Sequence, residues 1–79
     1  MIENLKNLIK LFINDKDLLS VVLKKNEHDV PTVNIQVSSN DMKRVIGSGG
    51  RVYRSLKTLV KYSLNNEFAD LIIDVNNNK

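Results

Sequence analysis

The fold of this 79-residue sequence is decided by one stretch near its middle, Val45-Ile46-Gly47-Ser48-Gly49-Gly50-Arg51. All three glycines of the chain fall within four of these positions, so bare backbone is open there to a ligand, with no Cβ in the way. The apolar periodicity predicts a helix of little more than one turn over 42–46 and a longer helix over 51–64. The N–H groups that begin the second helix point towards the loop, where they favour an anion.

The basic residues of the chain gather around this loop. The net charge is only +3, but residues 42–66 hold six basic side chains and no acidic one, whereas both flanking segments are mildly acidic. Such clustering is the electrostatic footprint of a surface that binds a polyanion, although a solvated helix face gives the same pattern. The six residues are Lys43, Arg44, Arg51, Arg54, Lys57 and Lys61.

Two other phosphate-binding motifs are excluded by their spacing. The dinucleotide fingerprint G-x-G-x-x-G needs a glycine where Val52 stands, and the Walker loop needs a Gly-Lys pair that the sequence lacks. Both motifs also follow a strand, whereas residues 42–46 are predicted to be helical. A sharp turn alone would need one glycine rather than three, so the loop favours a binding function.

The composition excludes several classes of function. With no cysteine and a single histidine, His28, the chain has neither a disulfide framework nor the ligands of a thiolate or multi-histidine metal site. No apolar run approaches the ~20 residues of a membrane span, and the N-terminus lacks a signal-peptide cleavage site. No nucleophile or oxyanion site accompanies His28, which lies in a predicted turn. We therefore expect a cytoplasmic domain that is not an enzyme, holds no cofactor or metal and does not enter a membrane.

The remaining segments predict a small α+β domain. Apolar residues at helical spacing indicate one amphipathic helix, and short apolar or alternating runs indicate strands. The helix covers residues 2–13, and the strands cover 18–25, 33–37 and 68–75. Residues 38–40 offer N-caps for the short helix, and Asn65-Asn66 can close the long helix in the left-handed conformation. Residues 76–79 are predicted to be a disordered tail.

These motifs resemble those of KH domains. The stretch from Val45 to Arg51 is similar to the V-I-G-x-x-G-[RK] signature of that family, whose GxxG loop clamps about four nucleotides. The predicted element order matches the second, mainly bacterial, KH topology. The short chain and Asn40-Asp41-Met42 ahead of the loop are similar to the KhpA family of small RNA-binding proteins. The resemblance implies one type II KH domain over residues 2–75, with the order α-β-β-α-α-β and a three-stranded mixed sheet that carries its helices on one face.

The resemblance also implies a site for single-stranded RNA. The loop glycines would contact phosphates, nearby basic residues would attract them, and one apolar residue of the short helix would give the bases a floor. The implied RNA-binding residues are Lys43, Arg44, Val45, Ile46, Gly47, Ser48, Gly49, Gly50, Arg51 and Arg54. One departure is that the family commonly has Lys or Arg at a variable loop position, where this chain has Ser48 and Gly49. Either of the two tyrosines could stack on a base. Tyr53 borders the apolar arc of its helix, which favours contact with the core or a partner over stacking, and Tyr62 lies at the margin of the helix.

A single small clamp predicts a need for a second copy. Four nucleotides give few base contacts, and linking two such sites raises the effective affinity. The KhpA resemblance implies a homodimer and a KhpB-like partner, a larger KH protein also called Jag or EloR. It further implies an RNA chaperone linked to cell-wall growth and cell length. A different function remains open, in which the same fold is an adaptor that binds proteins with weak or no RNA binding.

Overall fold

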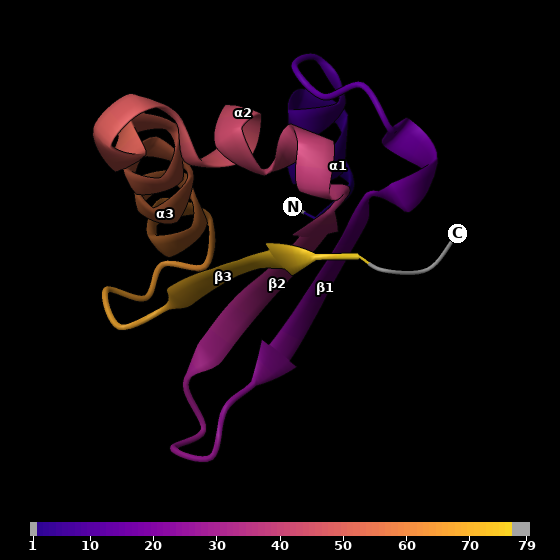
Figure 1. The fold of residues 1–79 in the computed structure, drawn as a ribbon. Helices are drawn as coiled ribbons and strands as arrows, with labels where there is room; N and C mark the ends of the chain where they lie inside the picture. The colour runs from indigo at the N-terminus through magenta and orange to yellow at the C-terminus, as the bar shows by residue number, and fades with distance from the viewer. Residues whose placement is uncertain (1, 77–79) are drawn as a thin grey trace.

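The computed structural model describes residues 2–76 and packs three α-helices against a three-stranded sheet (Figure 1). The order α-β-β-α-α-β is the predicted one, so the expectation of an α+β domain of this topology is confirmed. The elements are α1 (Ile2–Lys10), β1 (Ser20–Lys25), β2 (Pro31–Val37), α2 (Met42–Ile46), α3 (Arg51–Ser63) and β3 (Asp70–Val75), with short 3-10 turns η1 (Lys16–Leu18), η2 (Ser39–Asp41) and η3 (Ser48–Gly50).

The sheet is mixed, as expected. Strand β2 lies in the centre, antiparallel to β1 and parallel to β3. In this register Ile35 of β2 lies opposite Val21 of β1 and Ile73 of β3. The antiparallel pair is a hairpin, whereas β3 returns beside β2 only after the chain has passed through α2 and α3. The strand order β1-β2-β3 makes β3 an edge strand, and helices α2 and α3 both contact it.

The helices cover one face of the sheet. Alternate residues of β2 point to that face, and Val33, Ile35 and Val37 are fully buried there. The intervening Asn34 and Gln36 point to the other face, which is open in Figure 1. The strand alternation in the sequence thus correctly marked the buried face. The core is completed by Leu5, Ile9, Ile13, Leu19, Val45, Leu56, Val60, Ala69 and Leu71.

The N-terminal elements are shorter than predicted. Helix α1 ends at Lys10 because the next two backbone N–H groups bond three residues back, which tightens the last turn. The apolar pattern continues to Ile13 nevertheless, since this side chain is still part of the core. Strand β1 begins at Ser20, because residues 16–18 form the 3-10 turn η1 instead of the start of a strand.

The turn after α3 follows the sequence prediction. Asn65 has a φ of +50°, the left-handed conformation expected at the end of this helix. The backbone N–H of Phe68 then donates to Asn66 Oδ1 at 2.9 Å, which forms a local turn. Strand β3 starts after that turn, at Asp70 rather than at the predicted residue 68.

The predicted C-terminal tail differs from the structure at its first residue. The backbone N–H of Asn76 donates to the Val37 carbonyl at 2.7 Å, and its side-chain Nδ2 donates to the Leu18 carbonyl at 2.8 Å. Asn76 thus continues the pairing of β3 with β2. The rest of the predicted tail, residues 77–79, lies outside the described residues.

Candidate nucleic-acid interface

The glycine loop joins α2 to α3 with its backbone on the surface. The Gly47 N–H closes α2 by donating to the Lys43 carbonyl at 2.8 Å, and the Gly50 N–H donates to the Gly47 carbonyl at 3.1 Å. A Cβ on Gly47 would lie 2.6 Å from Val52 Cγ2, so this glycine lets α2 and α3 approach closely. A Cβ on Gly49 or Gly50 would meet nothing within 4 Å, so these two face open space.

The first turn of α3 begins directly beside this open backbone. Its N-cap position is Gly50, which has no side chain to occupy the helix N–H groups. Arg51 follows immediately and its side chain is exposed. Three features that favour an anion therefore meet at one place. They are the backbone of the glycine loop, the positive end of the α3 dipole and the Arg51 guanidinium.

A cleft of about 460 Å³ opens between the loop and the sheet edge. Ile46 at the end of α2 is 37% exposed and forms an apolar part of the wall. Val45, which the sequence analysis placed in the binding site, is fully buried in the core. That expectation was wrong, because the core takes the Val45 side of α2 and leaves only Ile46 open. The cleft is lined by Ile46, Gly50, Tyr53, Asp70, Leu71, Ile72 and Ile73.

The opposite wall is the backbone edge of β3. The Asn76 N–H points to β2, so even-numbered residues of this strand turn their backbone groups inwards and odd-numbered ones turn them to the edge. At the edge, the Tyr53 hydroxyl donates to the Leu71 carbonyl at 2.8 Å, and Asp70 Oδ1 accepts from the Leu71 N–H at 2.8 Å. Among the described residues, no side chain bonds the backbone of Ile73. This residue therefore presents a free donor and a free acceptor inside the cleft.

The six basic residues of segment 42–66 divide into those with an ion pair and those without one. Arg44 pairs with Asp41 at 3.3 Å and also donates to the Asn40 carbonyl, and Lys57 pairs with Asp70 at 3.3 Å. In the described part of the chain, the other four have no ion pair and remain available to an external anion. The expectation that Arg44 attracts phosphate stays a prediction: its Nη1 serves Asp41 and Asn40, while the side chain is still 47% exposed. The unpaired four are Lys43, Arg51, Arg54 and Lys61.

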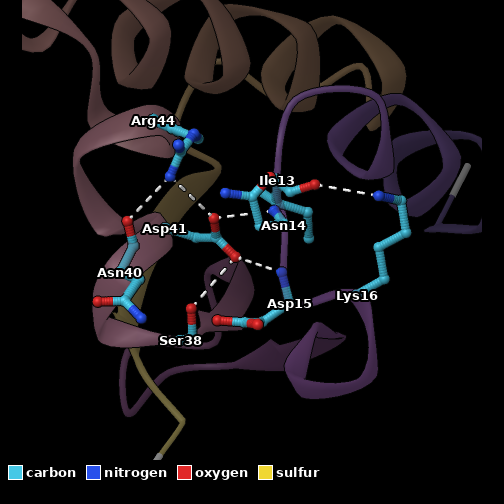
Figure 2. A network of polar contacts seen from close by, with 8 residues as sticks. All are labelled: Ile13, Asn14, Asp15, Lys16, Ser38, Asn40, Asp41 and Arg44. Atoms are coloured by element: carbon cyan, nitrogen blue, oxygen red, sulfur yellow. Dashed lines mark hydrogen bonds and ion pairs between the residues drawn. The ribbon is translucent and has the colours of Figure 1, made fainter.

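Asp41 organises the start of α2 in a way that the sequence analysis missed (Figure 2). Its side chain has no exposed surface, and its carboxylate accepts from the backbone N–H groups of Asn14 at 2.9 Å and Asp15 at 2.8 Å. It also accepts from the Ser38 hydroxyl at 3.2 Å and from Arg44. Burial alone would raise the pKa of Asp41, but these hydrogen bonds and the guanidinium charge outweigh it and lower the pKa below its ordinary value.

This network holds the start of α2, the helix that leads into the glycine loop. It joins the chain that follows α1 to the 3-10 turn that leads into α2, across 26 or 27 residues of sequence. The residues predicted as N-caps form no side-chain capping bond to α2 or η2. Asp41, which the sequence analysis named only within the family-like stretch Asn40-Asp41-Met42, instead joins two segments that are distant in sequence.

The two tyrosines lie in different environments. Tyr53 packs against the core and is bonded to the β3 edge, as its position on the apolar arc predicted. Tyr62 is 85% exposed. His28 Nε2 lies 3.6 Å from Glu27 Oε1 in the exposed hairpin turn. Within residues 2–76, no helix is long and apolar enough to cross a bilayer, and no cluster of three His, Cys, Asp or Glu side chains is placed to hold a metal ion.

A GxxG loop between two helices, facing the edge of a three-stranded mixed sheet in the order α-β-β-α-α-β, defines a KH domain of the second type. A sequence-family model described as the KH domain of KhpA/KhpB matches residues 2–75. The chain therefore belongs to the KhpA/KhpB KH-domain family. Membership in this family suggests RNA binding, and KH domains are typically non-catalytic. The resemblance on which the sequence analysis relied is thus confirmed.

A solved structure supports the fold independently. The chain is similar to Era from Aquifex aeolicus in a crystal structure with bound GDP.AlF4-, with a TM-score of 0.58 and 16% sequence identity. The match covers 94% of this chain but only 30% of the Era chain, and at this identity it shows the fold alone. No curated protein sequence matches the chain significantly.

Proposed function

We propose that this domain binds single-stranded RNA, with the phosphates over the glycine loop and the bases in the cleft against β3. The observation that carries the proposal is the open backbone at Gly49 and Gly50, where nothing lies within 4 Å of a Cβ position, next to the start of α3, which has no side-chain cap. A nucleic-acid backbone can approach these amides closely. A cleft of about 460 Å³ adjoins them on the side of the sheet edge.

The two walls of the cleft have different tasks in this proposal. The loop amides, Arg51 and Lys43 hold the phosphates, a contribution that does not depend on base sequence. Ile46 offers an apolar surface to a base, and the unbonded backbone donor and acceptor of Ile73 face the base edge. Because the loop residues Ser48 and Gly49 carry no charge, binding depends on the backbone donors and on the neighbouring basic residues.

A pair of double variants tests this proposal. Ser48→Asp with Gly49→Asp places two carboxylates against the phosphates, and we expect the affinity for a short single-stranded RNA to fall at least tenfold, about 1.4 kcal/mol. Ser48→Asn with Gly49→Asn has nearly the same shape without the charge and is the matched control. Fluorescence anisotropy with labelled RNA measures both variants. Equal binding by the two would show that RNA does not contact this loop.

The domain acts as a pair in this proposal, as a homodimer in the cytoplasm or with a KhpB-like KH protein. The family model that matches the chain is named for both KhpA and KhpB. Leu8 of α1 is 40% exposed and Leu59 of α3 is 39% exposed. A cleft between these two helices offers an apolar contact surface. Two linked clamps gain affinity by avidity, which suits an RNA chaperone. Its cellular role in this proposal is control of cell-wall growth and cell length.

A protein-binding adaptor is the second candidate function. The observation that favours it is the apolar side of the helical layer, where Leu11 is 80% exposed close to the partly exposed Leu8. Such side chains suit a partner protein as well as a second copy. Size-exclusion chromatography with light scattering and RNA titrations on Leu8→Ser separate the two candidates. An adaptor loses its protein partner and has no measurable RNA binding before or after the change.

A further inference from the structure

We propose that the bound RNA strand continues past the cleft along α3 and stacks one base on the exposed ring of Tyr62. This inference rests on the proposed function, because it extends the same strand beyond the glycine loop. It assigns a ligand contact to the far end of α3, about 13 Å along the helix from Tyr53 at a rise of 1.5 Å per residue. Neither the loop nor the cleft includes this end of the helix.

Two neighbouring rows of side chains run along α3 towards that end. Residues four apart in a helix lie one above the other, so Tyr53, Lys57 and Lys61 form one row. Arg54, Thr58 and Tyr62 form the second row, and the Thr58 hydroxyl is turned onto the helix, where it donates to the Arg54 carbonyl at 3.0 Å. No acidic residue occurs in α3, and neither Arg54 nor Lys61 has an ion pair among the described residues.

The second row ends in a broad, open depression of about 970 Å³. Its lining is mostly polar and includes one cation, Lys61, and one carboxylate, Glu67. The ring of Tyr62, 85% exposed, is the one aromatic surface there. The packing of this domain gives no reason for an aromatic residue at this position, since the ring is outside the core. The lining residues are Thr58, Lys61, Tyr62, Asn65, Asn66 and Glu67.

The cleft and the depression are neighbours along the helix. Asp70 lines the cleft, and its Oδ1 is 3.3 Å from Lys57 Nζ. Lys57 is thus at the end of the cleft, and Lys61, one helical turn further, already lines the depression. The Lys57 charge also offsets the Asp70 carboxylate, which would otherwise repel a phosphate at this crossing point.

This arrangement has the two elements of single-stranded nucleic-acid binding. Unpaired cations, here Arg54 and Lys61, follow the phosphates, and an exposed aromatic ring stacks a base of any sequence. The cleft accounts for about four nucleotides. A strand of roughly ten nucleotides, within the usual range of such sites, is long enough to occupy both places. Length dependence of binding is therefore the signature of the proposal.

The first test uses the absence of tryptophan from the chain. Tyr62→Trp introduces a single fluorescent reporter at the proposed stacking position. We expect its emission to be quenched by an oligonucleotide of about ten nucleotides and unchanged by one of about four, although both bind. Quenching by both lengths, or by neither, would contradict the proposed path.

The second test measures affinity. Tyr62→Ala is expected to weaken binding of the ten-nucleotide RNA at least about fivefold, the lower end of what one stacked base contributes, and to leave the four-nucleotide RNA unaffected. Phe68→Ala is the matched control, since Phe68 is 73% exposed but lies outside the lining of the depression. Equal affinity of Tyr62→Ala and parent chain for the longer RNA would overturn the inference.

The two proposals fail in distinguishable ways. If the loop variant with Ser48→Asp and Gly49→Asp retains binding of both RNA lengths, the proposed function itself is wrong. If that variant loses both lengths but Tyr62→Ala changes neither, only the extension along α3 is wrong. A loss of self-association by Tyr62→Ala, measured by light scattering without RNA, would instead assign the ring to a protein interface and would also overturn the inference.

Discussion

The two ends of helix α2 differ in how their polar groups are used. At its start, the Asp41 carboxylate is fully buried and is bonded to two backbone N–H groups, a hydroxyl and a guanidinium (Figure 2). At its end, Gly49 and Gly50 hold their backbone in open space, and the first turn of α3 has no side-chain cap. Five residues separate a buried side-chain junction from a loop with no side chain over its backbone at Gly49 and Gly50, although the Gly50 N–H donates to the Gly47 carbonyl.

Under the proposed function, the junction serves stability and the loop serves RNA binding. A loop of three glycines has little rigidity of its own. Its position is fixed instead by the close contact at Gly47 with Val52 and by the network behind α2. Changes at the junction should therefore act on the free energy of unfolding, and changes at the loop should act on RNA affinity.

The largest expected effect is at the junction. Asp41→Ala leaves the N–H groups of Asn14 and Asp15 without an acceptor, and we expect a loss of about 3 kcal/mol in the free energy of unfolding. Urea denaturation followed by circular dichroism measures it. Asp17→Ala removes an exposed carboxylate from the nearby turn η1 and is the control, expected to change stability little. Similar losses for both variants would contradict the account of the junction.

The next effect separates two glycines of the same loop. Both have positive φ, but Gly49 (φ +62°, ψ +19°) is close to the left-handed helical region, where an alanine adds strain of about 1–2 kcal/mol, whereas Gly47 (φ +79°, ψ +169°) is in a region open essentially to glycine alone. Gly47→Ala also drives its Cβ against Val52, and we expect it to destabilise the domain by clearly more than Gly49→Ala. Thermal unfolding of both variants tests this order. The reverse order would mean that the loop is not held through Gly47.

The same-substitution pair Arg44→Gln and Arg51→Gln compares the two ends of α2 directly. Arg44→Gln removes a charged partner from Asp41 and is expected to cost about 1–2 kcal/mol of stability. Arg51→Gln should leave stability unchanged, lower RNA affinity and reduce the slope of log affinity against log salt by about one. Equal salt slopes for the two variants would contradict the assignment of Arg51 to phosphate.

A smaller effect concerns how the free energy of unfolding depends on pH under acidic conditions. Because the folded-state pKa of Asp41 lies below its ordinary value of 3.8, the unfolded chain binds more protons in this range. The stabilisation by Asp41 is therefore complete above pH 3.8 and is lost as the pH falls through the lowered folded-state value. Asp41→Asn should remove this part of the pH dependence. An unchanged acid profile in that variant would show that other carboxylates dominate it.

Local patterns predicted most of the fold. The order of helices and strands was predicted correctly because burial imposes a helical or alternating period on each segment. The glycine loop was found from the clustering of the three glycines in the sequence, and the left-handed end of α3 at Asn65-Asn66, seen at Asn65, from the chemistry of helix ends. Boundaries were less accurate. Helix α1 ends at Lys10 although its apolar pattern runs on to Ile13, since a residue can reach the core from outside a helix.

Nonlocal features of the site were beyond such patterns. In a helix of one turn, periodicity does not tell which of Val45 and Ile46 faces the core, and the sheet decides it. The acceptor role of Asp41 depends on residues 26 and 27 positions away in sequence. The open backbone of Ile73 follows from β3 being an edge strand, and its edge-facing register follows from the pairing with β2.

The central claim is tested most directly by the amide chemical shifts of the domain during titration with a short single-stranded RNA. The largest changes are expected at Gly49, Gly50, Arg51 and Ile73, while amides of the Asp41 junction and of the open sheet face stay nearly unchanged. Changes confined to the α1 and α3 surface around Leu59, with the loop amides unmoved, would contradict the claim that RNA is held over the glycine loop.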